Sequence, residues 1–125
     1  MSLSEAINDV KAFHRAFGAP IRTTPAIPSD EERQLRWGLM VEEMSELGEA
    51  FANDDMIEIS DALADLIYVA IGMALVYGIP LDEVWEEVQN SNMQKLGGGV
   101  REDGKILKPD DWEPPRIAEV LAKHA

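Results

Sequence analysis

The sequence EEMSELGEAFANDDMIEISDALAD, residues 42–65, places two acidic helical patterns on either side of a short polar turn. Residues three, four and seven positions apart share one face of a helix. Glu43 and Glu46 therefore point the same way, and so do Glu58, Asp61 and Asp65. The polar residues 53–55 favour a turn that ends one helix and caps the next.

These acids lie in line with apolar residues. At roughly 100° per residue, the first acids share an arc with Leu35 and Leu47, and the later acids share one with Val69. A carboxylate on an apolar face is costly unless it is neutralised or binds a cation. No Lys or Arg occurs between Arg36 and Lys95, so the local sequence offers no ion-pair partner. Oxygen-only ligands favour magnesium or manganese. The expected metal ligands are Glu43, Glu46, Glu58, Asp61 and Asp65.

Some of the acids also have a purely structural interpretation. Glu58 follows Asp55 by three residues, so it also fits a capping arrangement at a helix start. Glu42 and Glu49 lie towards the edge of the apolar arc, where solvation alone explains them. A structural role without metal is therefore the alternative for the cluster.

Apolar spacing and chain breakers predict the rest of the fold. Ser29 and Glu32 have the spacing of a capping box that opens a long helix. No stretch has strand-like alternation of any length, so we expect an all-α fold in a single domain over residues 1–125. The architecture predicted is an antiparallel four-helix bundle with a short extra C-terminal helix. The expected helices span residues 3–17, 29–52, 55–77, 81–95 and 116–123.

Composition excludes several classes of function. The chain has 125 residues, a net charge of −13 and no cysteine. Such a charge argues against a basic nucleic-acid-binding surface and suits a protein that gathers cations. Disulfides and thiolate zinc sites are excluded, which permits a cytoplasmic location. The longest apolar run, residues 66–79, is shorter than the roughly 20 residues of a bilayer span, so we expect neither a membrane segment nor a signal peptide.

Basic residues gather in one short stretch of this acidic chain, from Lys95 to Lys108. Asn92 and Lys95 continue the expected inner face of the helix over residues 81–95, and the glycines at 97–99 let the following segment fold back. We interpret the stretch as phosphate-binding, with snorkelling of Lys95 and a solvated tail as the alternatives. Three aromatic residues could stack on a base, namely Trp37, Tyr68 and Trp85, although aromatics at helical spacing are more often core. Tyr68 is the one we include among the binding candidates. The substrate-binding candidates are Tyr68, Asn92, Lys95, Lys105 and Lys108.

Glu43-x-x-Glu46 followed by Glu58-x-x-Asp61 resembles the paired acidic motif of the all-α nucleoside triphosphate pyrophosphohydrolases. That superfamily includes MazG-like enzymes, phosphoribosyl-ATP pyrophosphohydrolase and the dimeric dUTPases. The stretch SNMQK at residues 91–95 extends the resemblance towards the branch that includes MazG-like dUTP pyrophosphatases. That branch often has a histidine where this chain has Gln89, so no role of that histidine is carried over.

The resemblance implies a magnesium-dependent enzyme that cleaves a nucleoside triphosphate between the α and β phosphates, with dUTP as the leading substrate. One carboxylate must stay free of metal to accept a proton, and Glu42 or Glu43 is the candidate. A homodimer or higher homo-oligomer is also implied, and the uniformly apolar residues 66–75 favour it. The alternatives are a phosphoribosyl or modified nucleotide as substrate, or a non-catalytic acidic dimer that serves protein contacts.

Overall fold

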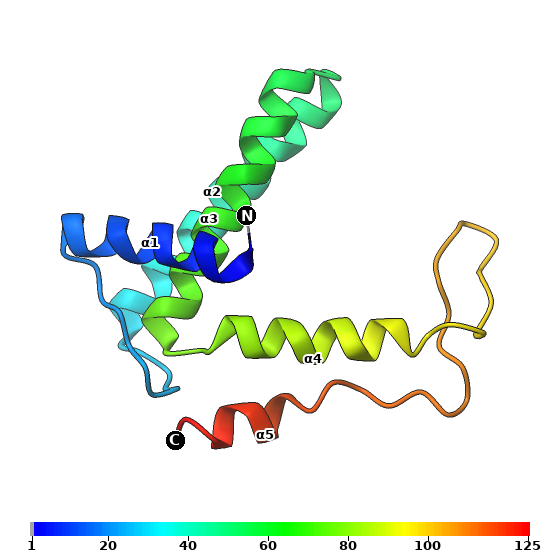
Figure 1. Ribbon diagram of the computed structural model, residues 1–125. Coiled ribbons are helices and arrows are strands. Elements are labelled where there is room, and N and C mark those ends of the chain that lie inside the picture. The colour runs from blue at the N-terminus through cyan, green and yellow to red at the C-terminus, as the bar shows by residue number, and fades with distance from the viewer. Residues whose placement is uncertain (1) are drawn as a thin grey trace. The chain divides into compact units, whose positions relative to one another are not determined.

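The computed structural model describes residues 2–125 and is built of helices (Figure 1). No strand forms within the described residues, where a single isolated antiparallel bridge joins Val100 and Ile106. The chain divides into two compact units, one ending at Ile79 and the other beginning at Pro80. The all-α class expected from the sequence is confirmed. The helices are α1 (Leu3–Phe17), α2 (Asp30–Ala52), α3 (Met56–Tyr77), α4 (Leu81–Met93) and α5 (Ile117–Ala122).

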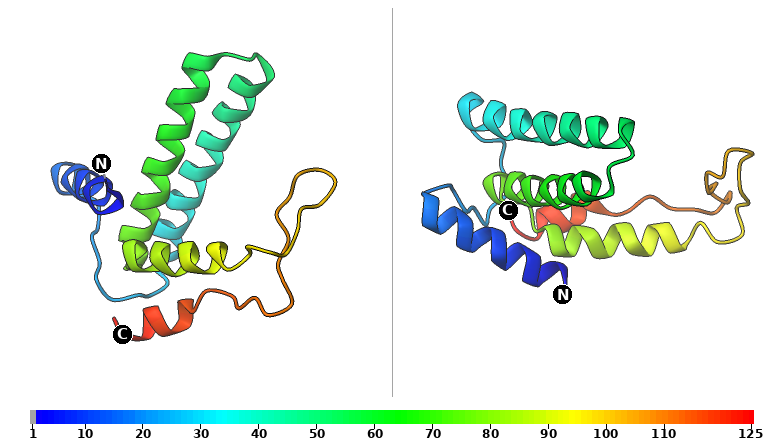
Figure 2. Two further views of the ribbon diagram at one scale, coloured as in Figure 1. Left: turned by 45° about the vertical axis from the view of Figure 1, so that its right-hand side comes forward. Right: turned by 90° about the horizontal axis from the view of Figure 1, so that it is seen from above.

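In the first unit, α2 and α3 run side by side as an antiparallel hairpin, and α1 crosses α3 (Figure 2). The buried part of α1 consists of Val10 and His14. On α3 the buried residues concentrate in the C-terminal half, from Ile71 to Val76. The core of this unit therefore lies where α1 meets the second half of α3, away from the turn of the hairpin.

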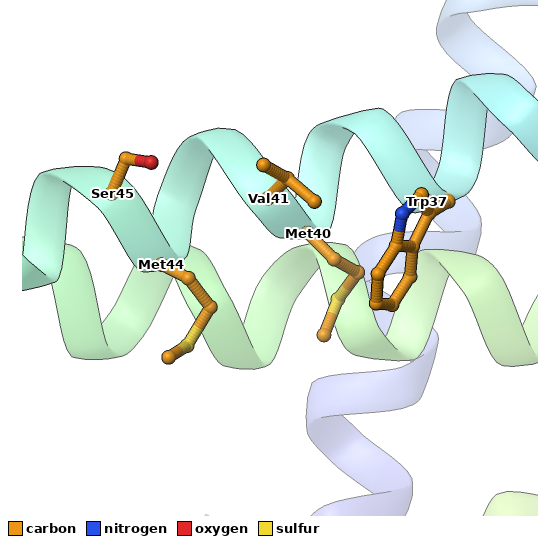
Figure 3. A pocket seen from close by; sticks show the side chains of 5 residues that line it. All are labelled: Trp37, Met40, Val41, Met44 and Ser45. Atoms are coloured by element: carbon orange, nitrogen blue, oxygen red, sulfur yellow. The ribbon is translucent and has the colours of Figure 1, made fainter.

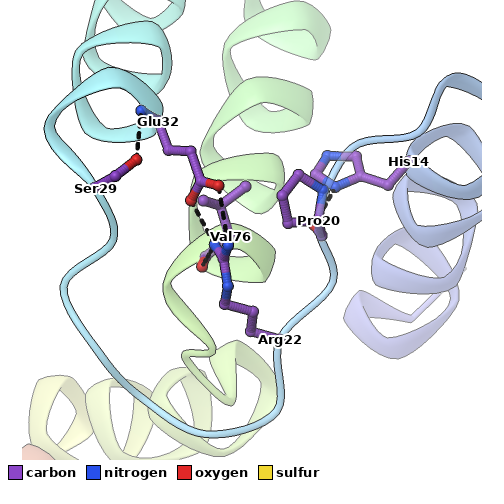
Figure 4. A network of polar contacts seen from close by, with 6 residues as sticks. All are labelled: His14, Pro20, Arg22, Ser29, Glu32 and Val76. Atoms are coloured by element: carbon purple, nitrogen blue, oxygen red, sulfur yellow. Dashed lines mark hydrogen bonds and ion pairs between the residues drawn. The ribbon is translucent and has the colours of Figure 1, made fainter.

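A strap of residues 22–26 closes the C-terminal end of α3 (Figure 4). The guanidinium of Arg22 donates to both carboxylate oxygens of Glu32, at 2.7 and 3.0 Å, and to the carbonyl of Val76 at 2.9 Å. Gly78 has a φ of +71°, and a Cβ there would lie 2.2 Å from the carbonyl oxygen of Thr24. Only glycine permits both this backbone conformation and this close approach.

The capping box predicted at the start of α2 is only half formed. The Ser29 hydroxyl accepts from the backbone N–H of Glu32, at 3.3 Å. The Glu32 carboxylate instead pairs with Arg22, because a bidentate charged pair is stronger than a bond to a neutral amide. Hydrogen bonding to Arg22 lowers the pKa of Glu32. This long-range pair attaches the start of α2 to the strap.

In the second unit, α5 packs on α4. The short helix is held at its end by a contact between the His124 ring and the Glu83 carboxylate. α4 ends at Met93, two residues before the expected end, and α5 is one residue shorter at each end than expected. The segment between these helices returns along α4, where buried Ser91 donates to the carbonyl of Glu113 at 3.0 Å.

The α2–α3 hairpin leaves a broad apolar surface open. α3 is long and apolar enough to cross a membrane by length and composition alone, a test that the core helix of a soluble protein also passes. Only 33% of its most apolar window is buried within the chain. Leu63 and Ile67 of α3 are exposed, and on α2 a shallow groove of about 300 Å³ runs beside Trp37 and Met44 (Figure 3).

Candidate active site

Three carboxylates from α2 and α3 converge on one point. Glu43, Glu46 and Asp65 each offer an oxygen atom, and these atoms all lie within 4.8 Å of one another. The two glutamates lie about one turn apart on α2, and the antiparallel hairpin brings Asp65 of α3 alongside them. The group could hold a metal ion, since hard oxygen ligands from several side chains are what magnesium and manganese prefer.

Glu43 is the member of the group whose carboxylate has the least favourable surroundings. Its Oε2 atom is buried and has no hydrogen-bond partner among the described residues. Burial raises the pKa of Glu43, and the neighbouring charges of Glu46, Asp65 and Asp61 raise this pKa further. An orphaned buried oxygen among like charges is costly, and a cation placed there would remove both penalties. The residues present therefore fit a divalent metal ion.

Three of the predicted site acids, Asp61, Glu58 and Glu42, stand outside this group. Asp61 is close enough to act on the pKa of Glu43, but Glu58 is exposed at the start of α3. The backbone N–H of Glu58 donates to the Asp55 carboxylate at 3.1 Å, so the capping interpretation is confirmed. Glu42 is exposed on α2 and is likewise not part of the converging group. Metal binding by Glu58 and proton transfer by Glu42 stay predictions.

A cavity of about 370 Å³ opens beside the carboxylates and is lined by Glu43 and Asp65 together with residues of all three helices. Tyr68 forms part of its wall, in an edge-to-face contact with Phe13 of α1 at 5.6 Å between ring centroids. Tyr68 as a whole is 37% exposed. Tyr68 therefore lies beside the carboxylates with part of its surface free, as base stacking requires.

Two polar residues in this cavity were not among the sequence-based candidates. His14 is 2% exposed, and its Nδ1 lies 2.9 Å from the carbonyl of Pro20 (Figure 4). A carbonyl accepts only, so Nδ1 carries the proton. The Arg36 guanidinium lines the same cavity, and burial lowers its pKa. A Cβ on Gly72 would lie 3.1 Å from Arg36 Nη1 and 3.2 Å from His14 Nε2.

Within the described residues no ion pair joins these acids to a Lys or Arg, as the sequence predicted, but the Arg36 guanidinium lines the same cavity. Arg36 precedes Glu43 by seven residues, which is two helical turns and the same face of α2. This spacing is visible in the sequence, and it predicts that the Arg36 guanidinium lies on the same helix face as Glu43. The position of His14 was not readable in this way, because it depends on how α1 crosses α3.

The other substrate-binding candidates lie in the second unit. Asn92 is exposed on the last turn of α4. Lys95 lies beyond the end of α4, so it does not continue an inner helix face as expected. The ammonium groups of Lys95 and Lys108 lie 5.7 and 4.4 Å from the ring centroid of Trp112. Lys105 is exposed in the loop between them.

Comparison with known proteins matches residues 10–92 to the family model described as phosphoribosyl-ATP pyrophosphohydrolase. The matched residues include every member of the carboxylate group and most of the cavity wall. A protein of Acanthamoeba polyphaga mimivirus, described as uncharacterized protein L479, is 39% identical over 77 residues. The aligned part is 58% of this chain and 31% of the viral protein's own length. The segment from Lys95 to Trp112 lies outside the matched family range.

Proposed function

Because the chain belongs to the phosphoribosyl-ATP pyrophosphohydrolase family, we propose that it hydrolyses a nucleoside triphosphate between the α and β phosphates. The products would be a nucleoside monophosphate and pyrophosphate, and dUTP is the substrate we put first. The observation that carries the proposal is the convergence of Glu43, Glu46 and Asp65 beside a cavity with an aromatic wall. A phosphoribosyl nucleotide is the second candidate substrate, favoured by the description of the family.

Magnesium is the cation we propose for the carboxylate group, with manganese as the alternative. The ligands we propose are Glu46, Glu58, Asp61 and Asp65, and Glu43 joins them where Glu42 serves as the base. The orphaned Oε2 of Glu43 and the mutual repulsion of the acids support this proposal. A divalent cation, when bound, neutralises phosphate charge and lowers the pKa of a coordinated water.

The general base would be a carboxylate that stays free of metal. Glu43 suits this role, because its raised pKa makes it a stronger proton acceptor than an ordinary carboxylate. Its neighbour Glu42 is the alternative. The base would take a proton from the water that attacks phosphorus, and the P–O bond to the pyrophosphate leaving group would break.

The cavity beside the carboxylates would receive the base and sugar. Its volume of about 370 Å³ lies within the size range of small-molecule sites. Tyr68 would stack on the base, while Arg36 and the Nε2 atom of His14 would offer a donor and an acceptor to its polar edge. The residues we propose to bind phosphate are Asn92, Lys95, Lys105 and Lys108.

We also propose that the chain forms a homo-oligomer, most simply a two-fold dimer. The support is the open apolar surface of the hairpin, where Leu63 is 47% and Ile67 is 58% exposed. A surface of this kind marks an interaction site in a soluble protein. Light scattering at micromolar concentration should give about twice the mass of one chain, and a monomer would contradict the proposal.

A substrate panel tests the proposed activity. The panel contains dUTP, the other common nucleoside triphosphates and phosphoribosyl-ATP, each with magnesium, with manganese or with excess chelator. Chromatography of the phosphate products should show pyrophosphate and no orthophosphate. Orthophosphate release would indicate cleavage at the terminal phosphate and a different class of enzyme. Release of neither product from any substrate would favour the non-catalytic interaction module.

A further inference from the structure

Two lysines of the second unit gather around one tryptophan. Lys95 follows α4 by two residues and Lys108 lies thirteen residues further on, yet both ammonium groups lie near the ring of Trp112. Lys108 is the nearer, at 4.4 Å from the ring centroid. An ammonium group over an indole ring is attracted by the negative face of the ring.

The tryptophan itself is fixed to α4. Its indole Nε1 donates to the carbonyl of Ser91 at 2.7 Å. The hydroxyl of the same serine donates to the carbonyl of Glu113, and Ser91 is 4% exposed. These two bonds join α4 to a segment more than twenty residues later in the chain. The ring is therefore a fixed platform, and it does not share the freedom of an exposed loop.

The loop between the lysines is closed by backbone contacts. Gly99 accepts from the N–H of Leu107 at 3.0 Å, and Arg101 donates to the carbonyl of Lys105 at 2.7 Å. A Cβ on Gly98 would lie 2.3 Å from the Leu107 carbonyl oxygen, so only glycine permits this approach of the two limbs. The closure brings together the two limbs of the loop, and both ammonium groups lie near the Trp112 ring.

Neither Lys95 nor Lys108 forms an ion pair with another of the described residues. Among residues 2–125, the ion pairs of the second unit involve Arg101, Arg116 and His124 and neither of these two lysines. The full chain has 24 acidic residues and 11 Lys and Arg residues. In so acidic a chain, two gathered lysines without a carboxylate partner leave positive charge available for an external anion.

We propose that Trp112 is a positioning residue that holds Lys95 and Lys108 as a pre-formed site for a diphosphate or triphosphate group. This inference rests on the proposed function, because the anion would be the polyphosphate of the substrate or the pyrophosphate product. Two ammonium groups around one ring suit an anion that has several charged oxygens along a chain. A single orthophosphate would satisfy them less well.

Titration of the intact protein with inorganic pyrophosphate tests the site without turnover. Calorimetry is carried out in excess chelator, so that the carboxylate group cannot contribute through a metal ion. Wild type should show saturable binding of pyrophosphate that is at least about tenfold tighter than its binding of orthophosphate, since a tenfold change corresponds to one well-formed charged contact. No saturation up to millimolar pyrophosphate would overturn the proposal.

Substitutions then distinguish a positioning role of Trp112 from a nonspecific effect of positive charge. Trp112→Leu should weaken pyrophosphate binding by about five- to thirtyfold, on the scale of two cation–π contacts. Trp112→Phe keeps a ring face and should recover most of the affinity. Lys108→Gln should weaken binding to a similar extent as Trp112→Leu, and it decides the outcome if Trp112→Leu fails to fold. The matched control is Arg101→Gln, because Arg101 is already paired with Asp103 at 2.6 Å.

The outcomes distinguish this inference from the proposed function. The Trp112→Leu variant could bind pyrophosphate as tightly as wild type does, while the wild-type enzyme releases pyrophosphate from a triphosphate. This result would overturn the inference about Trp112 and leave the proposed function intact. The opposite result is saturable, Trp112-dependent binding of pyrophosphate by a protein that hydrolyses no triphosphate. It would support the anion site and overturn the proposed function.

Discussion

The carboxylate group on α2 and α3 and the lysine pair around Trp112 both bring like charges together, but by different means. Helical periodicity and the antiparallel hairpin place Glu43, Glu46 and Asp65 side by side. Backbone closure of a loop and an aromatic platform place Lys95 and Lys108. Burial, together with the neighbouring acids, raises the pKa of Glu43, whereas the lysines are attracted to the indole ring.

The difference shows which site depends on a ligand for its stability. An orphaned carboxylate oxygen among other acids destabilises the folded chain until a cation binds. The lysines already have a favourable neighbour before any anion arrives. We therefore expect metal to raise the stability of the protein strongly and pyrophosphate to raise it weakly, since a ligand that binds only the native state stabilises it according to its affinity.

The largest expected effect comes from removing a charge at the carboxylate group. Glu46→Gln and Asp61→Asn should each lower kcat/KM by on the order of a thousandfold, because the charge stabilisation supplied by a bound metal is worth several kcal/mol. Each change should also reduce the rise in Tm that magnesium produces. Steady-state kinetics and thermal melts with and without magnesium measure both effects.

Glu49→Gln is the matched control for these variants, since Glu49 is an exposed acid on the same helix. It should keep both the activity and the magnesium response. Full activity of wild type in excess chelator would show that the carboxylates do not act through a metal ion.

Removing a lysine should have a smaller effect. Lys95→Ala should lower kcat/KM by roughly ten- to a hundredfold, because a hydrogen bond to a charged group contributes about 1.5–3 kcal/mol. The rise in Tm with magnesium should survive, since the carboxylates remain, and the product should still be pyrophosphate. Activity equal to wild type across the substrate panel would leave the phosphate role to Lys105 and Lys108.

A smaller effect still is expected at the floor of the cavity. Gly72→Ala would place a methyl group about 3.1 Å from Arg36 and 3.2 Å from the buried ring of His14. His14 is held by its bond to Pro20 and cannot easily yield, so we expect a loss of about 1 kcal/mol in unfolding free energy, at the low end for overpacking. Urea denaturation measures it.

Gly48→Ala is the control for that change, because a Cβ at Gly48 meets nothing within 4 Å. Alanine is the better helix former by up to about 1 kcal/mol, so this variant should be as stable as wild type or more so. If Gly72→Ala raises the unfolding free energy as Gly48→Ala does, Arg36 and His14 can accommodate the added methyl group.

The smallest expected effect is the pH dependence of stability that Glu43 causes. The raised pKa of Glu43 means that the native state holds this proton more tightly than the unfolded state does. In metal-free protein the stability should therefore fall as pH rises from the ordinary glutamate pKa through the raised pKa. Glu43→Gln abolishes this loss, so its advantage in Tm over wild type should grow with pH and then level off.

Thermal melts in chelator across the acid and neutral range test this sign, with Glu49→Gln as the reference variant. With magnesium present, the order should reverse at neutral pH, because a cation in the carboxylate group favours the charged form of Glu43 and offsets the repulsion from the other acids. A Tm difference that is independent of pH would mean that Glu43 titrates like an exposed glutamate.

Local patterns predicted the helices well but did not predict the contacts that loop residues make. α1 and the C-terminal end of α3 lie where apolar spacing and glycine placed them, because helix starts and stops depend on nearby residues. The capping box at Ser29 was only half right, since Arg22 offers Glu32 a stronger partner from outside the helix. Arg36 shows a signal that was present at helical spacing and was overlooked.

The sequence by itself determined that the chain is all-α and that acids one turn apart share a helix face, because helical periodicity is a local property. Only the tertiary structure decided which of those acids converge, separating Glu43, Glu46 and Asp65 from Glu58, whose backbone N–H is capped by Asp55. It also decided that His14 enters the cavity wall and that Trp112 gathers two lysines. These placements depend on helix crossing and loop closure, which join residues far apart in the chain and leave no periodic trace in the sequence.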